Sequence, residues 1–186
     1  MNLYEKIKGY TPRNMQEEKD KEAFLAFLKK EAKPFSRETE AGHITVSAWI
    51  VNKEKNKVLF CYHNIYNSWS WVGGHADGEE DLLKVAIKEA YEETGAAVKG
   101  CSDDIFSLEI LPVSGHMKKG IYIPSHIHYN VTFLVEADEN AEIKNKPDEN
   151  SAVMWIQNEK IAEYSTEEWM VKNIYSKIIA GYADFK

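Results

Sequence analysis

One continuous segment, residues 73–96, constrains the fold of this chain more than any other. It begins with a glycine-rich turn, GGHADGEE, which can bring backbone N–H and C=O groups close to a ligand. Directly after it, Glu80–Thr94 has apolar residues at helical spacing, namely Leu83, Ala86, Ile87 and Ala90. Gly95 follows, where a helix often ends in a left-handed residue. The segment therefore predicts a helix that is joined without a linker to a tight glycine turn.

The acids of this segment indicate a cation site. Asp77 to Glu93 contain seven acids and only two lysines. Glu89, Glu92 and Glu93 share one helix face, and like charges at that spacing cost roughly 0.3 kcal/mol per pair. Three carboxylates within one turn are oxygen ligands of the kind that Mg²⁺ or Mn²⁺ takes, often together with a phosphate substrate. A solvated acidic helix face is the alternative interpretation.

The segment GGHADGEEDLLKVAIKEAYEETGA resembles the Nudix box, the sequence motif of the Nudix hydrolase family. The box covers Gly74–Ala96 here. Gly74 takes the place of the first glycine, Glu80 follows after five residues, and the block from Lys88 to Ala96 follows after seven. Every fixed position matches except one, because the family has an arginine where this chain has Lys88. Lysine keeps the charge but loses the planar fork of arginine, so we expect weaker bracing of Glu89.

The resemblance implies a role for each matching residue. The metal ligands would be Glu89, Glu92, Glu93 and the main-chain carbonyl of Gly73, and Mg²⁺ (or Mn²⁺) would be the cofactor. Structural support would come from Gly74, Glu80, Lys88 and Gly95. The general base differs within the family, so Glu89, Glu93 and Glu149, an acid of a late loop, stay open as catalytic candidates.

The rest of the chain predicts a mixed α/β or α+β fold. Asn14 and Pro34 bracket an amphipathic helix, and β-branched or aromatic runs follow at 43–51, 57–63, 68–74, 104–115, 127–137 and 152–157. A closing helix is expected over 161–182, with a break near Ser165 and Thr166. The resemblance implies an α/β/α sandwich with a mixed central sheet. We expect two parts, an N-terminal helical extension (1–41) and a Nudix-like catalytic domain (42–186).

Weaker signals surround the box. His126 and His128 face the same side of an extended run and, with His75, could bind phosphate or a second metal, although pocket or surface histidines are the plainer interpretation. Trp71 leads into the glycine turn and could contact the substrate, although aromatic strand residues are usually core.

Basic groups that could hold a diphosphate are few. The only arginines are Arg13 and Arg37, and Lys118–Lys119 lie in an expected loop between Gly115 and Gly120. Pro112 lies where ADP-ribose-cleaving members resemble one another in having proline, although a proline at the end of a strand also has a structural explanation.

The composition excludes some partners. A net charge of −7 argues against coating a nucleic acid polymer, and no apolar run is long enough to span a bilayer. The opening residues lack the apolar region of a secretory signal, so a cytoplasmic location is expected.

We therefore expect an Mg²⁺-dependent pyrophosphohydrolase that acts on a small phosphorylated metabolite, such as an NDP-sugar or ADP-ribose, and that forms a homodimer as the resemblance allows. Two alternatives stay open. One is an isomerase of the isopentenyl diphosphate type, which would need a catalytic cysteine such as Cys61, and the other is a catalytically silent nucleotide-binding module.

Overall fold

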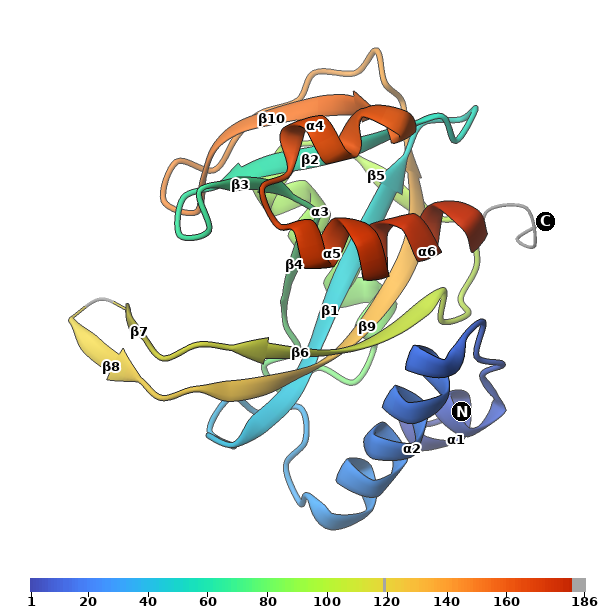
Figure 1. Ribbon diagram of the computed structural model, residues 1–186, viewed down its shortest axis with the longest axis vertical. Coiled ribbons are helices and arrows are strands. Elements are labelled where there is room, and N and C mark those ends of the chain that lie inside the picture. The colour runs from blue at the N-terminus through green and yellow to red at the C-terminus, as the bar shows by residue number, and fades with distance from the viewer. Residues whose placement is uncertain (119, 182–186) are drawn as a thin grey trace.

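The computed structural model describes residues 1–118 and 120–181, and a curled mixed sheet forms its centre (Figure 1). Within these residues the main sheet has the strand order β10-β2-β1-β9-β5, and β3, β4 and β6 pair with β2, β1 and β9. The strands are β1 (Gly42–Val51), β2 (Lys57–His63), β3 (Ser68–Ser70), β4 (Val72–His75), β5 (Val98–Gly100), β6 (Ser107–Val113), β9 (His126–Ala137) and β10 (Asn150–Gln157). Strands β1 and β9 run parallel, whereas the other pairs are antiparallel.

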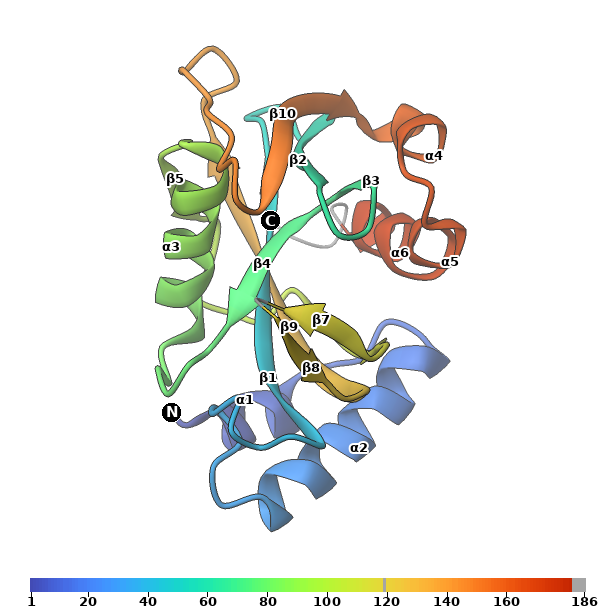
Figure 2. The same ribbon diagram turned by 90° about the vertical axis from the view of Figure 1, so that its left-hand side faces the viewer.

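Helices cover both faces of this sheet. Figure 2 shows α3 (Leu82–Thr94) on one side and the C-terminal helices on the other. Side chains of β1 alternate between two cores: Ile44 and Val46 pack in the core that α3 shares, and Trp49 and Val51 pack against the C-terminal helices. The α/β/α sandwich with a mixed sheet is therefore confirmed.

The N-terminal extension contains two helices instead of the single one expected. Helix α2 (Met15–Lys30) begins as predicted, since Asn14 Oδ1 accepts a hydrogen bond from Glu17 N at 2.9 Å. A short helix, α1 (Leu3–Gly9), precedes it, and both helices bury apolar residues in the core that α3 shares, among them Ile7 and Phe24. The division at residue 41 stays a prediction, although this shared core joins the two parts.

The C-terminal helix is interrupted near Ser165 and Thr166, as the sequence predicts. A 3₁₀ turn (Asn158–Lys160) and α4 (Ile161–Tyr164) precede the break, and α5 (Glu168–Met170), a π-helical turn (Val171–Tyr175) and α6 (Ser176–Ala180) follow it. Tyr182, the expected end of the helix, lies outside the described residues. In the described part of the chain, no helix combines the length and hydropathy that a membrane span requires.

Two strand pairings were not predicted from the sequence, because their strands are only three residues long and show no clear pattern. One is β5, which pairs with the end of β9. The other is the hairpin of β7 (His116–Lys118) and β8 (Ile121–Ile123), which extends the β6–β9 pair outward (Figure 1). The expected loop at Lys118–Lys119 is therefore wrong at Lys118, which is in a strand, and Lys119 lies outside the described residues.

Candidate active site

Gly73 and Gly74 lie in strand β4, so the expected turn is wrong at these two positions, and they let the strand approach helix α3. Strand β4 pairs with β1 so that Ser47 lies opposite Gly73 and Val46 opposite Gly74. A Cβ atom at Gly73 would come within 2.5 Å of Val46 O, and one at Gly74 would come within 2.6 Å of the Glu89 carboxyl carbon. The backbone contact excludes a side chain at Gly73, whereas a side chain at Gly74 would displace the Glu89 carboxylate from the space that it occupies.

Gly95 ends α3 as predicted. Its φ of 68° lies in the left-handed region, and its N–H donates to Tyr91 O at 2.8 Å. The N-terminal end differs slightly from expectation, because Asp81 caps the helix and Glu80 lies outside it. Glu80 is exposed, while its neighbour Glu79 accepts hydrogen bonds from Asp81 N and Lys84 Nζ. The supporting role of Glu80 stays a prediction.

Glu93 is the buried acid of the site, with only 4% of its surface exposed. Its Oε1 accepts a hydrogen bond from Gly73 N at 3.3 Å, and the thiol of Cys61 donates to its Oε2 at 3.6 Å. Burial, followed by the charge of Glu149, raises the pKa of Glu93 to about 8. A carboxyl group that is buried among other acids becomes more stable when a cation lies beside it.

Glu89 and Glu92 lie next to Glu93 on the same helix, and lysines contact both. Lys88 Nζ is 3.2 Å from Glu89 Oε1 and 3.1 Å from Glu92 Oε1, so the lysine that replaces the family arginine does reach these acids. Lys146 approaches the other oxygen of Glu92 at 3.8 Å. The pKa of Lys88 is raised, first by its hydrogen bond to Glu92, which keeps it charged.

A late loop brings Glu149 to the same place. Lys146 Nζ lies 3.0 Å from Glu149 Oε2, and Asn64 N donates to Glu149 O at 3.1 Å. The next residue, Asn150, is fully buried and donates from Nδ2 to the main-chain carbonyl of Glu93 at 3.0 Å. The Glu149 side chain is 44% exposed, so it is open to water while it contributes charge to the surroundings of Glu93.

Trp71 and Arg13 both pack against aromatic residues of the protein. The Trp71 ring packs against Trp49 and Tyr175, with centroid distances of 6.3 and 5.6 Å. Arg13 lies over the ring of Phe106 and donates to the carbonyl of that residue. A substrate contact of Trp71 stays a prediction, and the packing in its surroundings matches the core interpretation.

Arg37 is the arginine that comes close to the glycine turn. Its Nε donates to Asp77 Oδ1 at 2.6 Å, and a second bond joins the same two side chains. The Asp77 hydrogen bonds raise the pKa of Arg37, and the charge of Glu89 adds to this effect. The N-terminal extension thus supplies a positive charge near the box, which the sequence alone did not locate.

Four histidines form a cluster, which includes a residue that sequence reasoning missed. Parallel pairing of β1 and β9 puts His43 opposite His128. The nearest ring nitrogens of His43, His75 and His128 lie within 4.8 Å of one another, and His126 Nε2 is 3.1 Å from His128 Nε2. His43 lies near the start of β1, 85 residues before His128 in the sequence, and no local motif marks it.

Comparisons with known proteins agree with this geometry. A family model described as the NUDIX domain matches residues 41–178. Among solved structures, a NUDIX family hydrolase from Clostridium perfringens is 23% identical with a TM-score of 0.51, and covers 73% of this chain and 95% of its own. An Ap4A hydrolase from C. elegans is 20% identical with a TM-score of 0.51, and covers 76% and 96%. A MutT protein from Methanosarcina mazei Go1 is 18% identical with a TM-score of 0.54, and covers 80% and 98%. A search of curated proteins finds no match.

The fold and the site define a class, an α/β/α hydrolase with an acidic helix behind a glycine turn. The chain belongs to the Nudix family, because the family model covers most of its length. The expectation of a Nudix-type pyrophosphohydrolase is thereby confirmed, whereas the roles of individual residues and the substrate stay predictions.

Proposed function

We propose that this enzyme uses Mg²⁺ to hydrolyse the diphosphate linkage of a nucleoside diphosphate derivative, of the NDP-sugar or ADP-ribose type, or of a similar small phosphorylated metabolite. The observation that carries the proposal is the convergence of four acids. Helix α3 supplies Glu89, Glu92 and Glu93, and the late loop adds Glu149, whose charge acts on Glu93. Carboxylates gathered in this way can bind a divalent ion, and the ion would neutralise the phosphates of such a substrate.

The donor set suits Mg²⁺. Carboxylates and a main-chain carbonyl are the oxygen ligands that this ion takes, and the raised pKa of Glu93 reflects a buried acid that a cation would relieve. Glu89, Glu92, Glu93 and the Gly73 carbonyl would hold it. When bound, Mg²⁺ supplies charge neutralisation for the phosphoryl oxygens and the leaving group. Supporting this placement, Gly74 keeps clear the space into which the Glu89 carboxylate fits.

Of the open candidates for general base, Glu149 has the most suitable surroundings. Its side chain is 44% exposed and can meet an attacking water, whereas Glu93 is almost fully buried. Lys146 Nζ, 3.0 Å away, orients one oxygen and leaves the other to accept a proton. Asn64 N donates to the Glu149 carbonyl, and the side chain of the next residue, Asn150, donates to the Glu93 carbonyl, so the backbone at this carboxylate is held in place.

Cys61 argues against the isomerase alternative. The thiol is buried, and burial together with the charge of Glu93 raises its pKa well above the ordinary value. A thiol that keeps its proton is a poor nucleophile, so we expect Cys61→Ser to retain turnover.

The test is a panel of NDP-sugars, ADP-ribose and dinucleoside polyphosphates, assayed for release of mononucleotide with Mg²⁺, with Mn²⁺ and with chelator. We expect turnover only with a divalent ion, and its loss in Glu93→Gln. Glu18→Gln, which changes an exposed glutamate of α2, is the matched control and retains activity. Activity that survives Glu93→Gln, or that persists in chelator, would contradict the metal assignment, and loss of turnover in Cys61→Ser would revive the isomerase.

A further inference from the structure

The histidine cluster lies on the face of the sheet opposite the core under α3. Residues His43, Thr45 and Ser47 alternate along β1 with Ile44 and Val46, whose side chains face the core under α3. His43 therefore faces the opposite side of the sheet. On β9, His126 and His128 face that same side, since their neighbours Ile127 and Tyr129 alternate with them and Tyr129 packs against the α3 core. His75 ends β4, where it pairs with Thr45.

The protonation of two of these rings is fixed by main-chain carbonyls. His43 Nδ1 lies 3.2 Å from Thr39 O, and His126 Nδ1 lies 2.9 Å from Pro124 O. A carbonyl oxygen only accepts, so each Nδ1 carries the proton and each Nε2 presents a lone pair. A ring that donates from one nitrogen to a carbonyl and offers its other nitrogen is the arrangement found in metal-ligating histidines.

One of those lone pairs has no partner in the part of the chain that the structure describes. His43 is 4% exposed, and its Nε2 is a buried atom without a hydrogen-bond partner among the described residues. A buried nitrogen of this kind costs free energy unless something binds to it. The other lone pair, on His126 Nε2, points at His128 Nε2 at 3.1 Å, a contact that requires a proton or a cation.

We propose that His43, His75, His126 and His128 bind a divalent transition-metal ion of the zinc class, at a site separate from the glutamates. Imidazole nitrogens prefer Zn²⁺, Co²⁺ or Ni²⁺, whereas carboxylates and carbonyls prefer Mg²⁺, so the two sites select different ions. Zinc–nitrogen bonds of about 2.0 Å put neighbouring ligand atoms about 3.3 Å apart. Three of the nitrogens here already lie within 4.8 Å, so side-chain rotation can close the site.

The surroundings keep the cluster ready for a metal. His43 and His126 are buried and His128 is half-buried, and burial favours the uncharged form of an imidazole. Neutral imidazoles are the form that coordinates a metal. Because the four residues come from β1, β4 and β9, a bound ion ties together the three strands that support the glycine turn.

The experiment uses the full chain, freed of metal by chelation and then kept in millimolar Mg²⁺ so that the glutamate site is saturated. Zn²⁺ is added and binding is followed by calorimetry, and Co²⁺ is added and followed by visible absorption. We expect one ion per chain that excess Mg²⁺ does not displace, and a nitrogen-ligand Co²⁺ spectrum. His43→Ala and His128→Ala should each weaken zinc binding by at least about tenfold.

Two controls separate this site from the other. His63→Ala changes a histidine of β2 that stacks on Tyr66, and Glu92→Gln changes the glutamate site; both should leave zinc affinity unchanged. Nitrogen-15 shifts of the wild-type histidine rings on zinc addition give a readout that requires no variant to fold. The proposal would be overturned if zinc binding were lost in Glu92→Gln, if Mg²⁺ displaced the zinc, or if zinc bound without any change in the His43 and His128 rings. None of these outcomes would affect the proposed hydrolysis.

Discussion

Among single residues, Glu93 shows most directly what a buried acid costs in stability. The carboxyl group faces the Cys61 thiol from β2, the Gly73 amide from β4, Glu89 on its own helix and Glu149 from the late loop. Burial and the neighbouring acids raise its folded-state pKa to about 8, whereas the unfolded chain titrates near 4.5. Between these values the native state holds more protons, so the free energy of unfolding falls as pH rises.

Glu93→Gln should therefore stabilise the metal-free protein at high pH. We expect a gain on the order of 3 kcal/mol at pH 8.5 and little change at pH 4.5, since the cost of ionising the buried acid is removed. With saturating Mg²⁺ the order should reverse, because only the wild type binds the ion there. Urea unfolding at both pH values, with and without Mg²⁺, measures this. A wild-type stability that stays level between pH 4.5 and 8.5 would show that Glu93 is ionised throughout.

Among elements, the junction of α3 with the late loop decides where Glu149 lies. Asn150 is the link: Nδ2 donates to Glu93 O, and Oδ1 accepts from Lys146 N at 3.1 Å. In Asn150→Asp an oxygen would face the Glu93 carbonyl, so the bond is lost and the loop separates from the helix. As a positioning residue, Asn150 should affect kcat, by about tenfold or more, with little effect on KM.

The pH–rate profile of Asn150→Asp tests this role. A displaced Glu149 should shift the acidic limb of kcat, whereas a purely structural loss would lower the amount of active enzyme and leave the profile unchanged. Asn140→Asp, at an exposed asparagine of the same connection, is the matched control. An unchanged profile in Asn150→Asp would mean that Asn150 does not position the general base.

The sequence predicted best those features that depend on residues close together in the chain. Helix α3 and its Gly95 cap come from one local segment, where propensity, capping and spacing agree. Both appear, although the helix begins at Leu82 and the first residues of the expected turn lie in strand β4. Glu149 was a candidate by its position in a late loop, and its catalytic role stays a prediction. His43 could not be found, because its neighbour His128 is set by a parallel pairing that no local pattern specifies. For the same reason the approach of Arg37 to the turn was not predicted.

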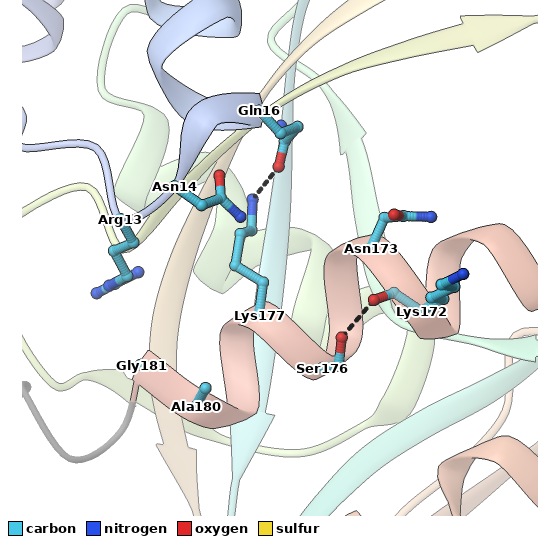
Figure 3. Close-up of a pocket in the computed structure, with 9 residues that line it drawn as sticks. All are labelled: Arg13, Asn14, Gln16, Lys172, Asn173, Ser176, Lys177, Ala180 and Gly181. Carbon is cyan, nitrogen blue, oxygen red and sulfur yellow. Dashed lines mark hydrogen bonds between the residues drawn. The ribbon is translucent and has the colours of Figure 1, made fainter.

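On the scale of the whole molecule, one buried charge network joins the N-terminal extension, the sheet and the last helix. Lys177 Nζ on α6 lies 3.1 Å from both Glu17 Oε1 on α2 and Glu109 Oε1 on β6, and the two acids are fully buried. The same nitrogen donates to Gln16 Oε1 at 3.0 Å, at the edge of a cavity of about 460 Å³ between α2 and α6 (Figure 3). Burial alone would raise the pKa of Glu17, but Lys177 and the Arg13 amide outweigh it and lower the pKa.

Lys177→Met should therefore destabilise the protein strongly. It leaves two buried acids without their cation, and breaking a buried pair in this way costs about 3–5 kcal/mol. Because the folded-state pKa of Glu17 is depressed, this contribution is present above its ordinary pKa near 4.5 and is lost as pH falls further, so the variant should differ most from the wild type at neutral pH. Urea unfolding at pH 7 measures the loss, and Lys172→Met, at an exposed lysine one turn earlier, is the control.

A triple variant separates the charge from the packing. If Glu17→Gln and Glu109→Gln accompany Lys177→Met, no buried charge remains, and most of the lost stability should return because the amides keep their hydrogen-bonding capacity. Tyr10 and Asn130 hold the two acids from other elements, at 2.7 and 3.0 Å, so the network survives as a neutral one. A triple variant as unstable as Lys177→Met alone would mean that the methylene packing of Lys177, and not its charge, holds the extension to the catalytic domain.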